Sequence, residues 1–183
     1  MGWYIHRTSK VTRSTCGNDG SQTYHVEYKM TNTLENSQIG ALTSYILGSG
    51  GQGVEKTLIY APAGGSISNL KTSGGSVTGS RQETLNGKTV YASIATIAPG
   101  ESVTYSFDVA TSTKAVSGLT IDQTPMGWTD SGVTTDTAVC SINSKKRAFR
   151  CLVWVSGSGC GGAGRVVWGY GYHVVVHRRP ATA

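Results

Sequence analysis

One stretch of the sequence, residues 98–109, constrains the fold more than any other. It opens with a Pro-Gly pair, which is typical of a turn, and then alternates between apolar and polar residues without a break. A period of two indicates a strand with one buried face and one solvated face. The apolar positions are Val103, Tyr105, Phe107 and Val109. Because their shared face needs a second layer to cover it, this stretch predicts a two-layer β fold. We expect this face to meet Val26, Tyr28 and Ile59 across the sandwich.

Similar strand patterns recur along the chain, separated by glycine-rich turns. Residues 24–30 also alternate, and Asn86-Gly87 is the strongest hairpin dipeptide present. The chain has 25 glycines and only 14% charged residues, a mixture that favours an extracellular β protein over a helical cytosolic one. We therefore predict an all-β fold, an immunoglobulin-like antiparallel β-sandwich of about seven to nine strands.

A single passage has helical spacing. Ile39, Leu42 and Ile46 recur near a period of 3.6, which predicts one short helix near residues 37–47. We expect this helix to lie over an edge of the sandwich.

The net charge of +6 is unevenly distributed. Residues 1–136 hold nine Lys and Arg against ten Asp and Glu, whereas residues 137–183 hold seven basic residues and no acidic one. A nearly neutral body has no field with which to attract a polyanion. We therefore expect no nucleic-acid partner.

The sequence changes character near its end, so we divide it into a β-sandwich domain, 1–142, and an irregular basic tail, 143–183. Residues 151–183 are rich in Gly, Val and Arg and lack Asp, Glu, Asn, Gln and Lys. Three explanations compete: an additional hairpin, a disordered tail, or out-of-frame translation of GC-rich DNA. The chain also begins within a strand-like segment, as a fragment of a longer protein would.

The four cysteines do not have the spacing of a metal site. Cys16 follows the first predicted strand and Cys140 lies near the end of the predicted domain. A disulfide between them would close a loop of more than 100 residues. The alternative is two buried thiols, and Cys151 and Cys160 have no assignment.

Motifs for catalysis are missing as well. There is no G-x-S-x-G, and no histidine lies between His25 and His173, so a serine enzyme would have to use His6 or His25. We expect His6 and His25 to be neighbours on the exposed face of the first hairpin, and most acidic residues to be solvated. We therefore predict no enzyme, and no catalytic, cofactor-binding or metal-binding residue.

Aromatic side chains leave a binding role open. Most of them fall on the buried face of a predicted strand, which favours the core. Trp128 is the exception, because it lies in a Pro-Met-Gly-Trp turn. We name Trp128 as the candidate ligand contact, with carbohydrate as the ligand class.

Several of these segments together resemble a known family: the C-terminal β-rich part of the domain-of-unknown-function family numbered 4012, found in envelope proteins of high-GC Gram-positive bacteria. The resemblance covers about residues 4–142. It is carried by residues 24–33, 34–47, 57–60, 61–69 and 97–102, the last including A-P-G-E-S.

The resemblance implies a cell-surface or extracellular location, a membrane anchor upstream of this chain, and no catalytic residues or cofactors. It favours a non-catalytic β-sandwich module of the cell envelope with a structural or interaction role. A module that binds carbohydrate or wall polymer is one alternative. The other is an accessory domain of an envelope enzyme whose active site lies upstream. The partner would be a wall polymer or another envelope protein.

Overall fold

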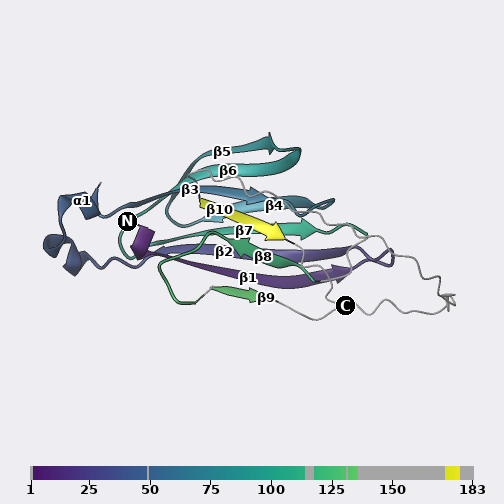
Figure 1. Ribbon diagram of the computed structural model, residues 1–183, viewed down its shortest axis with the longest axis horizontal. Coiled ribbons are helices and arrows are strands. Elements are labelled where there is room, and N and C mark those ends of the chain that lie inside the picture. The colour runs from purple at the N-terminus through teal and green to yellow at the C-terminus, as the bar shows by residue number, and fades with distance from the viewer. Residues whose placement is uncertain (1, 49, 114–117, 131, 136–171, 178–183) are drawn as a thin grey trace, which may run out of the picture.

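The computed structural model describes residues 2–48, 50–113, 118–130, 132–135 and 172–177. Over these residues the chain is an all-β sandwich of two five-stranded sheets, which confirms the predicted fold class. Ten strands are described, slightly more than expected, and the helical segments are short (Figure 1). The immunoglobulin-like detail stays a prediction.

Both sheets mix strands from distant parts of the sequence. The first sheet has the order β4 (Ser66–Ser73), β7 (Ser102–Ala110), β2 (Gln22–Asn32), β1 (Ile5–Cys16) and β9 (Val133–Thr135). The second has the order β5 (Ser76–Leu85), β6 (Lys88–Ile97), β3 (Gly53–Tyr60), β10 (Tyr172–His177) and β8 (Thr120–Gln123).

Most neighbouring strands run antiparallel, as predicted, but β1–β9 and β3–β10 run parallel. Parallel partners are joined by long connections. The alternation pattern of a single strand therefore does not predict which strand pairs with it in parallel.

Strand β7 provides the centre of the core. Its inward side chains Val103, Tyr105, Phe107 and Val109 are all buried, and the residues between them are partly exposed. The alternation in the sequence thus predicted both faces correctly.

One expectation about the neighbours of β7 is wrong. We expected Val26 and Tyr28 to face β7 across the sandwich, but β2 lies beside β7 in the same sheet, and these residues are opposite Phe107 and Tyr105. Ile59, on β3 of the other sheet, does share the core cluster with them. Faces can be predicted from one strand, whereas sheet membership depends on the connections.

Two predicted turns are present. Asn86 and Gly87 both have positive φ, 52° and 72°, which matches the tight hairpin turn between β5 and β6. The Pro99-Gly100 turn carries the chain from the second sheet to the first. The buried Asn32 side chain ties this region together, because its Nδ2 donates to the carbonyls of Gly51 and Ile97 at 2.8 and 3.0 Å.

The predicted helix is divided and differently placed. The 3-10 helix η2 (Asn36–Ala41) and the four-residue α1 (Ser44–Leu47) replace it, and neither contains a buried residue. Figure 1 shows them projecting from one end of the sandwich, near the chain start and the 3-10 helix η1 (Gly2–Tyr4), not covering an edge. The apolar spacing therefore predicted that this segment is helical but not where it packs.

Part of the predicted tail lies in the second sheet. The backbone of β10 pairs parallel with β3 and antiparallel with β8. Residues 136–171 and 178–183 lie outside the described part of the chain, so the domain boundary near residue 142 stays a prediction.

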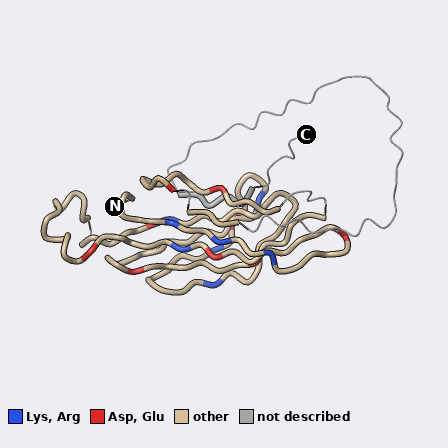
Figure 2. The backbone as a smooth tube through the Cα atoms, turned by 90° about the horizontal axis from the view of Figure 1, so that it is seen from below, with Lys and Arg blue, Asp and Glu red and all other residues tan. Residues whose placement is uncertain are grey.

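Along the described chain, Figure 2 shows Lys and Arg interspersed with Asp and Glu. In these residues no helix has the length and apolar character needed to cross a bilayer.

Candidate functional site

The loop after β8 is fastened to the beginning of β1. The Ser9 N–H donates to the carbonyl of Gly132 at 2.7 Å, and the Arg7 N–H donates to Sδ of Met126 at 3.2 Å. Gly132 has φ of 62°, and a Cβ there would lie 2.1 Å from the Arg7 carbonyl oxygen. Only glycine allows this close approach, which fixes the position of the loop that carries Trp128.

Arg7 holds the same loop from inside the sandwich. Its side chain is only 2% exposed, and Nη1 donates to both the carbonyl and the Oγ1 of Thr124, at 3.3 and 2.8 Å. A buried guanidinium with hydrogen-bonded partners is a rigid support. The parity of β1 predicts this inward position, but we did not assign it from the sequence.

Trp128 lies on the exposed side of this loop. Its side chain is 40% exposed, and its ring centroid is 4.7 Å from that of His6, with the planes tilted by 59°. The Nε2 of His6 is 3.4 Å from Oδ1 of Asp130. An aromatic face and two polar groups therefore share one small area.

A second tryptophan lies against the same loop. Trp3, 69% exposed, packs on Gly127, where an added Cβ would be 2.6 Å from Cε3 of the indole. We call Trp3, His6 and Trp128 the aromatic corner. The sequence does not predict that Trp3 lies beside Trp128, because this contact joins segments more than 120 residues apart.

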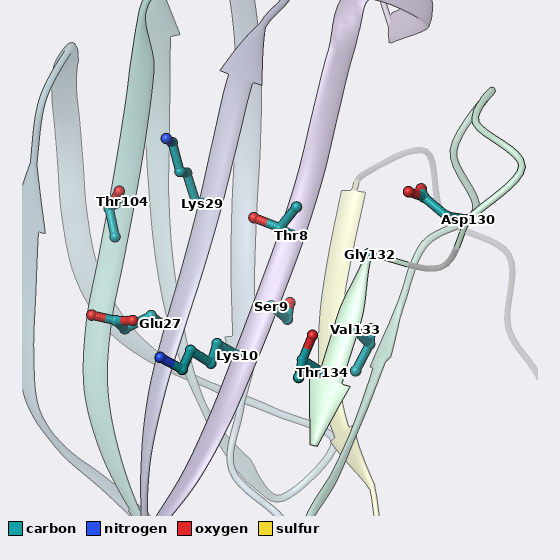
Figure 3. A pocket seen from close by; sticks show the side chains of 10 residues that line it. All are labelled: Thr8, Ser9, Lys10, Glu27, Lys29, Thr104, Asp130, Gly132, Val133 and Thr134. Atoms are coloured by element: carbon teal, nitrogen blue, oxygen red, sulfur yellow. The ribbon is translucent and has the colours of Figure 1, made fainter. Parts of the chain in front are cut away.

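Two hollows meet beside the aromatic corner. One, of about 360 Å³, is lined by residues of β8 and by Trp128. The other, of about 650 Å³, is a groove on the outer face of the first sheet (Figure 3). Asp130 and Val133 line both hollows, so the groove continues from the corner.

The groove has both signs of charge. Figure 3 shows Lys10, Lys29 and Glu27 on the sheet and Asp130 at the edge. Lys10 is opposite Glu27 in the β1–β2 register, and hydroxyl groups of threonines lie between the charges. The two lysines and the two carboxylates offer donors and acceptors without a net charge.

A hydrogen-bonded chain of three polar side chains lies elsewhere on this outer face. The Nδ1 of His25 is 2.8 Å from Oδ1 of Asp108, and its Nε2 is 3.3 Å from Oγ of Ser106. His25 is on β2 and the other two are on β7. The sequence predicted that all three lie on solvated faces, but their contact depends on the register, with His25 directly opposite Asp108.

A distortion of β4 completes this chain. The β4–β7 register shifts between Ser68 and Lys71, and Asn69 in that bulge has a positive φ of 54°. Its Nδ2 donates to Oδ2 of Asp108 at 2.7 Å. This hydrogen bond, followed by that from His25, lowers the pKa of Asp108 below its ordinary value, so the carboxyl group is ionised.

The two histidines of the first hairpin are therefore not neighbours, contrary to our expectation. His6 is opposite Thr31 and His25 is opposite Thr12, near the other end of the same pair of strands. Each histidine instead contacts an acidic residue from another strand or loop.

One acidic residue is not solvated. Glu55 on β3 is 3% exposed, and its Oε2 has no hydrogen-bond partner in the described part of the chain. Burial raises the pKa of Glu55, and the positive charge of Arg7 partly opposes that rise. Burial likewise raises the pKa of Tyr28.

The remaining sequence-based candidates are less defined. Cys16 is the last residue of β1, whereas Cys140, Cys151 and Cys160 lie outside the described residues, so the Cys16–Cys140 disulfide stays a prediction. Among the residues described, no three His, Cys, Asp or Glu side chains are grouped so that they could hold a metal ion.

Comparison with known proteins gives no relative. No family model, no curated protein and no solved structure matches the chain.

Proposed function

We propose that this chain is an extracellular, immunoglobulin-like β-sandwich module of the cell envelope that binds carbohydrate at the aromatic corner. The observation that carries the proposal is the pair of exposed tryptophans, Trp128 on the β8–β9 loop and Trp3 packed against that loop, beside His6 and Asp130. The apolar face of a sugar ring packs on an aromatic side chain, whereas its hydroxyl groups need polar partners. The corner offers both.

The adjoining groove supports an extended ligand. Its volume of about 650 Å³ and that of the hollow at Trp128, about 360 Å³, lie in the range of small-molecule sites. The groove has no net charge, because Lys10 and Lys29 are balanced by Glu27 and Asp130, so it does not favour a polyanion as ligand. We therefore favour a neutral glycan chain of a wall polymer as the ligand.

The test is binding of the purified protein to neutral and acidic wall polysaccharides, by affinity electrophoresis and calorimetry. We expect Trp128→Ala to weaken binding by about tenfold or more, equivalent to about 1.4 kcal/mol, because the ring contact is lost. Tyr45→Ala is the matched control, since Tyr45 is 94% exposed but lies in α1, outside both hollows.

Circular dichroism of both variants checks that they fold. If the wild-type protein binds none of the wall polysaccharides, or if Tyr45→Ala weakens binding as much as Trp128→Ala, the carbohydrate proposal fails. A purely structural or protein-binding envelope module would then be the better description.

A further inference from the structure

We propose that Ser106 is a nucleophilic serine, activated by His25, that accepts an acyl group from activated esters. This goes beyond the binding role, since Ser106 lines neither hollow at the aromatic corner. The proposal rests on the chain Asn69, Asp108, His25, Ser106, in which each side chain is within hydrogen-bond distance of the next.

The partners of His25 determine its tautomer. Asp108 is ionised and can only accept, so the Nδ1 of His25 carries the proton donated to Oδ1. In the neutral imidazole, Nε2 then has the free lone pair, and the Ser106 hydroxyl donates to it. This is the arrangement that a general base needs in order to take the proton of a serine.

The support of Asp108 requires an unusual backbone. Asn69 has a positive φ, which few residues other than glycine adopt, and it lies in a bulge of β4. The bulge directs the Asn69 amide at Asp108.

The site is open to small reagents and has a positive charge beside it. The side chains of His25 and Asp108 are 42% and 28% exposed. Lys71 is opposite Ser106 in the β4–β7 register, and Glu27 is opposite it on the β2 side. Ser106 therefore has one basic and one acidic neighbour across the strands, and the charge of Lys71 also favours the ionised form of Asp108.

The step can be written for p-nitrophenyl acetate. Ser106 Oγ bonds to the carbonyl carbon while its proton moves to Nε2 of His25. The bond from that carbon to the p-nitrophenolate oxygen then breaks, and the leaving group departs with the electron pair. The imidazolium loses the proton to solvent. The product is an acetyl ester on Ser106.

Turnover should be slow. Strand β7 lies between β4 and β2, so its backbone N–H groups lie in the plane of the sheet and none is directed at the ester oxygen above Ser106. A general base alone contributes about 10²–10⁴-fold. The acetyl ester on Ser106 is an alkyl ester and is less reactive than the p-nitrophenyl ester that forms it. We therefore expect one round of acylation per chain, followed by slower release.

The experiment treats the full chain with p-nitrophenyl acetate and, separately, with diisopropyl fluorophosphate, and maps the adduct by peptide mass spectrometry. We expect a burst of about one p-nitrophenolate per chain and a label on Ser106, with labelling at least about 10²-fold slower in His25→Gln and absent in Ser106→Ala. Ser102→Ala is the matched control, because Ser102 lies on the same face of β7 but bonds to Thr31.

Asp108→Asn should also slow labelling, which keeps the test informative if His25→Gln folds poorly by circular dichroism. The proposal is overturned if the label falls on lysine or tyrosine instead of Ser106, or if folded His25→Gln and Asp108→Asn both label at the wild-type rate. These probes do not use the aromatic corner. Failure of Ser106 labelling would therefore not affect the proposal of glycan binding, and failure of glycan binding would not affect the proposal for Ser106.

Discussion

At the scale of single residues, the least expected feature is a pair of opposite charges inside the sandwich. Arg7 is hydrogen-bonded to Thr124, whereas Glu55 is buried with one carboxylate oxygen that has no hydrogen-bond partner in the described chain. A buried carboxylate loses its hydration, and the pKa of Glu55 rises because this loss outweighs the attraction of Arg7. The sequence places Glu55 in a strand, but nothing in an isolated strand marks one glutamate as buried.

The raised pKa of Glu55 predicts a dependence of stability on pH. Its ordinary value is 4.5, and the folded chain holds the proton more tightly than the unfolded chain does. The contribution of Glu55 to stability is therefore complete below about pH 4 and is lost as the pH rises through the folded pKa. The melting temperature of Glu55→Gln should therefore rise relative to that of the wild type as the pH is raised from about 4 to about 7.

Thermal melts at several pH values, with the exposed Glu27→Gln as control, measure this difference. A gap between wild type and Glu55→Gln that stays constant over that pH range, or that Glu27→Gln reproduces, would contradict it.

At the scale of elements, the sequence predicted strands and faces but not register. The solvated positions of β7 and β2 were assigned correctly, yet the chain through Asp108, His25 and Ser106 arises only because β2 and β7 are neighbours with His25 opposite Asp108. In the same way, the turn containing Trp128 was visible in the sequence, whereas its contact with His6 was not. Local periodicity determines faces, and long-range contacts determine partners.

The attachment of the β8–β9 loop to β1 gives a prediction at this scale. Gly132→Ala should destabilise the protein by about 3 kcal/mol, since it adds a backbone clash with Arg7 to the strain of a positive φ. Gly87→Ala, which has a similar φ of 72° and no atom within 4 Å, should cost only about 1 kcal/mol.

Urea unfolding of the two variants measures both costs, and glycan binding by Gly132→Ala reports on the position of Trp128. Equal destabilisation by the two substitutions would show that the close approach to Arg7 does not matter.

At the scale of the whole molecule, the predicted disulfide would join distant parts of the chain. Cys16 ends β1, and Cys140 follows β9, the strand beside β1 in the first sheet. We expect a bridge between them in oxidised protein, with a contribution of about 4–5 kcal/mol from closing so long a loop. The sequence supplies the residues, but the pairing stays a prediction.

The measurement uses the variant Cys151→Ser/Cys160→Ser, in which only Cys16 and Cys140 remain. Non-reducing peptide mapping should find the Cys16–Cys140 peptide, and a reductant should lower the melting temperature. Recovery of both cysteines as alkylated thiols from secreted material would end this proposal.

The position of β10 has a consequence for synthesis on the ribosome. Strand β10 lies between β3 and β8, and its residue His173 pairs with Leu58, which is translated 115 residues earlier. One edge of β3 therefore stays without its strand partner until residues 172–177 have left the exit tunnel of the ribosome. Pairings of such high contact order form slowly and leave strand edges open to other chains. The second sheet is consequently completed late in synthesis, and until then the free edge of β3 is open to pairing with other chains.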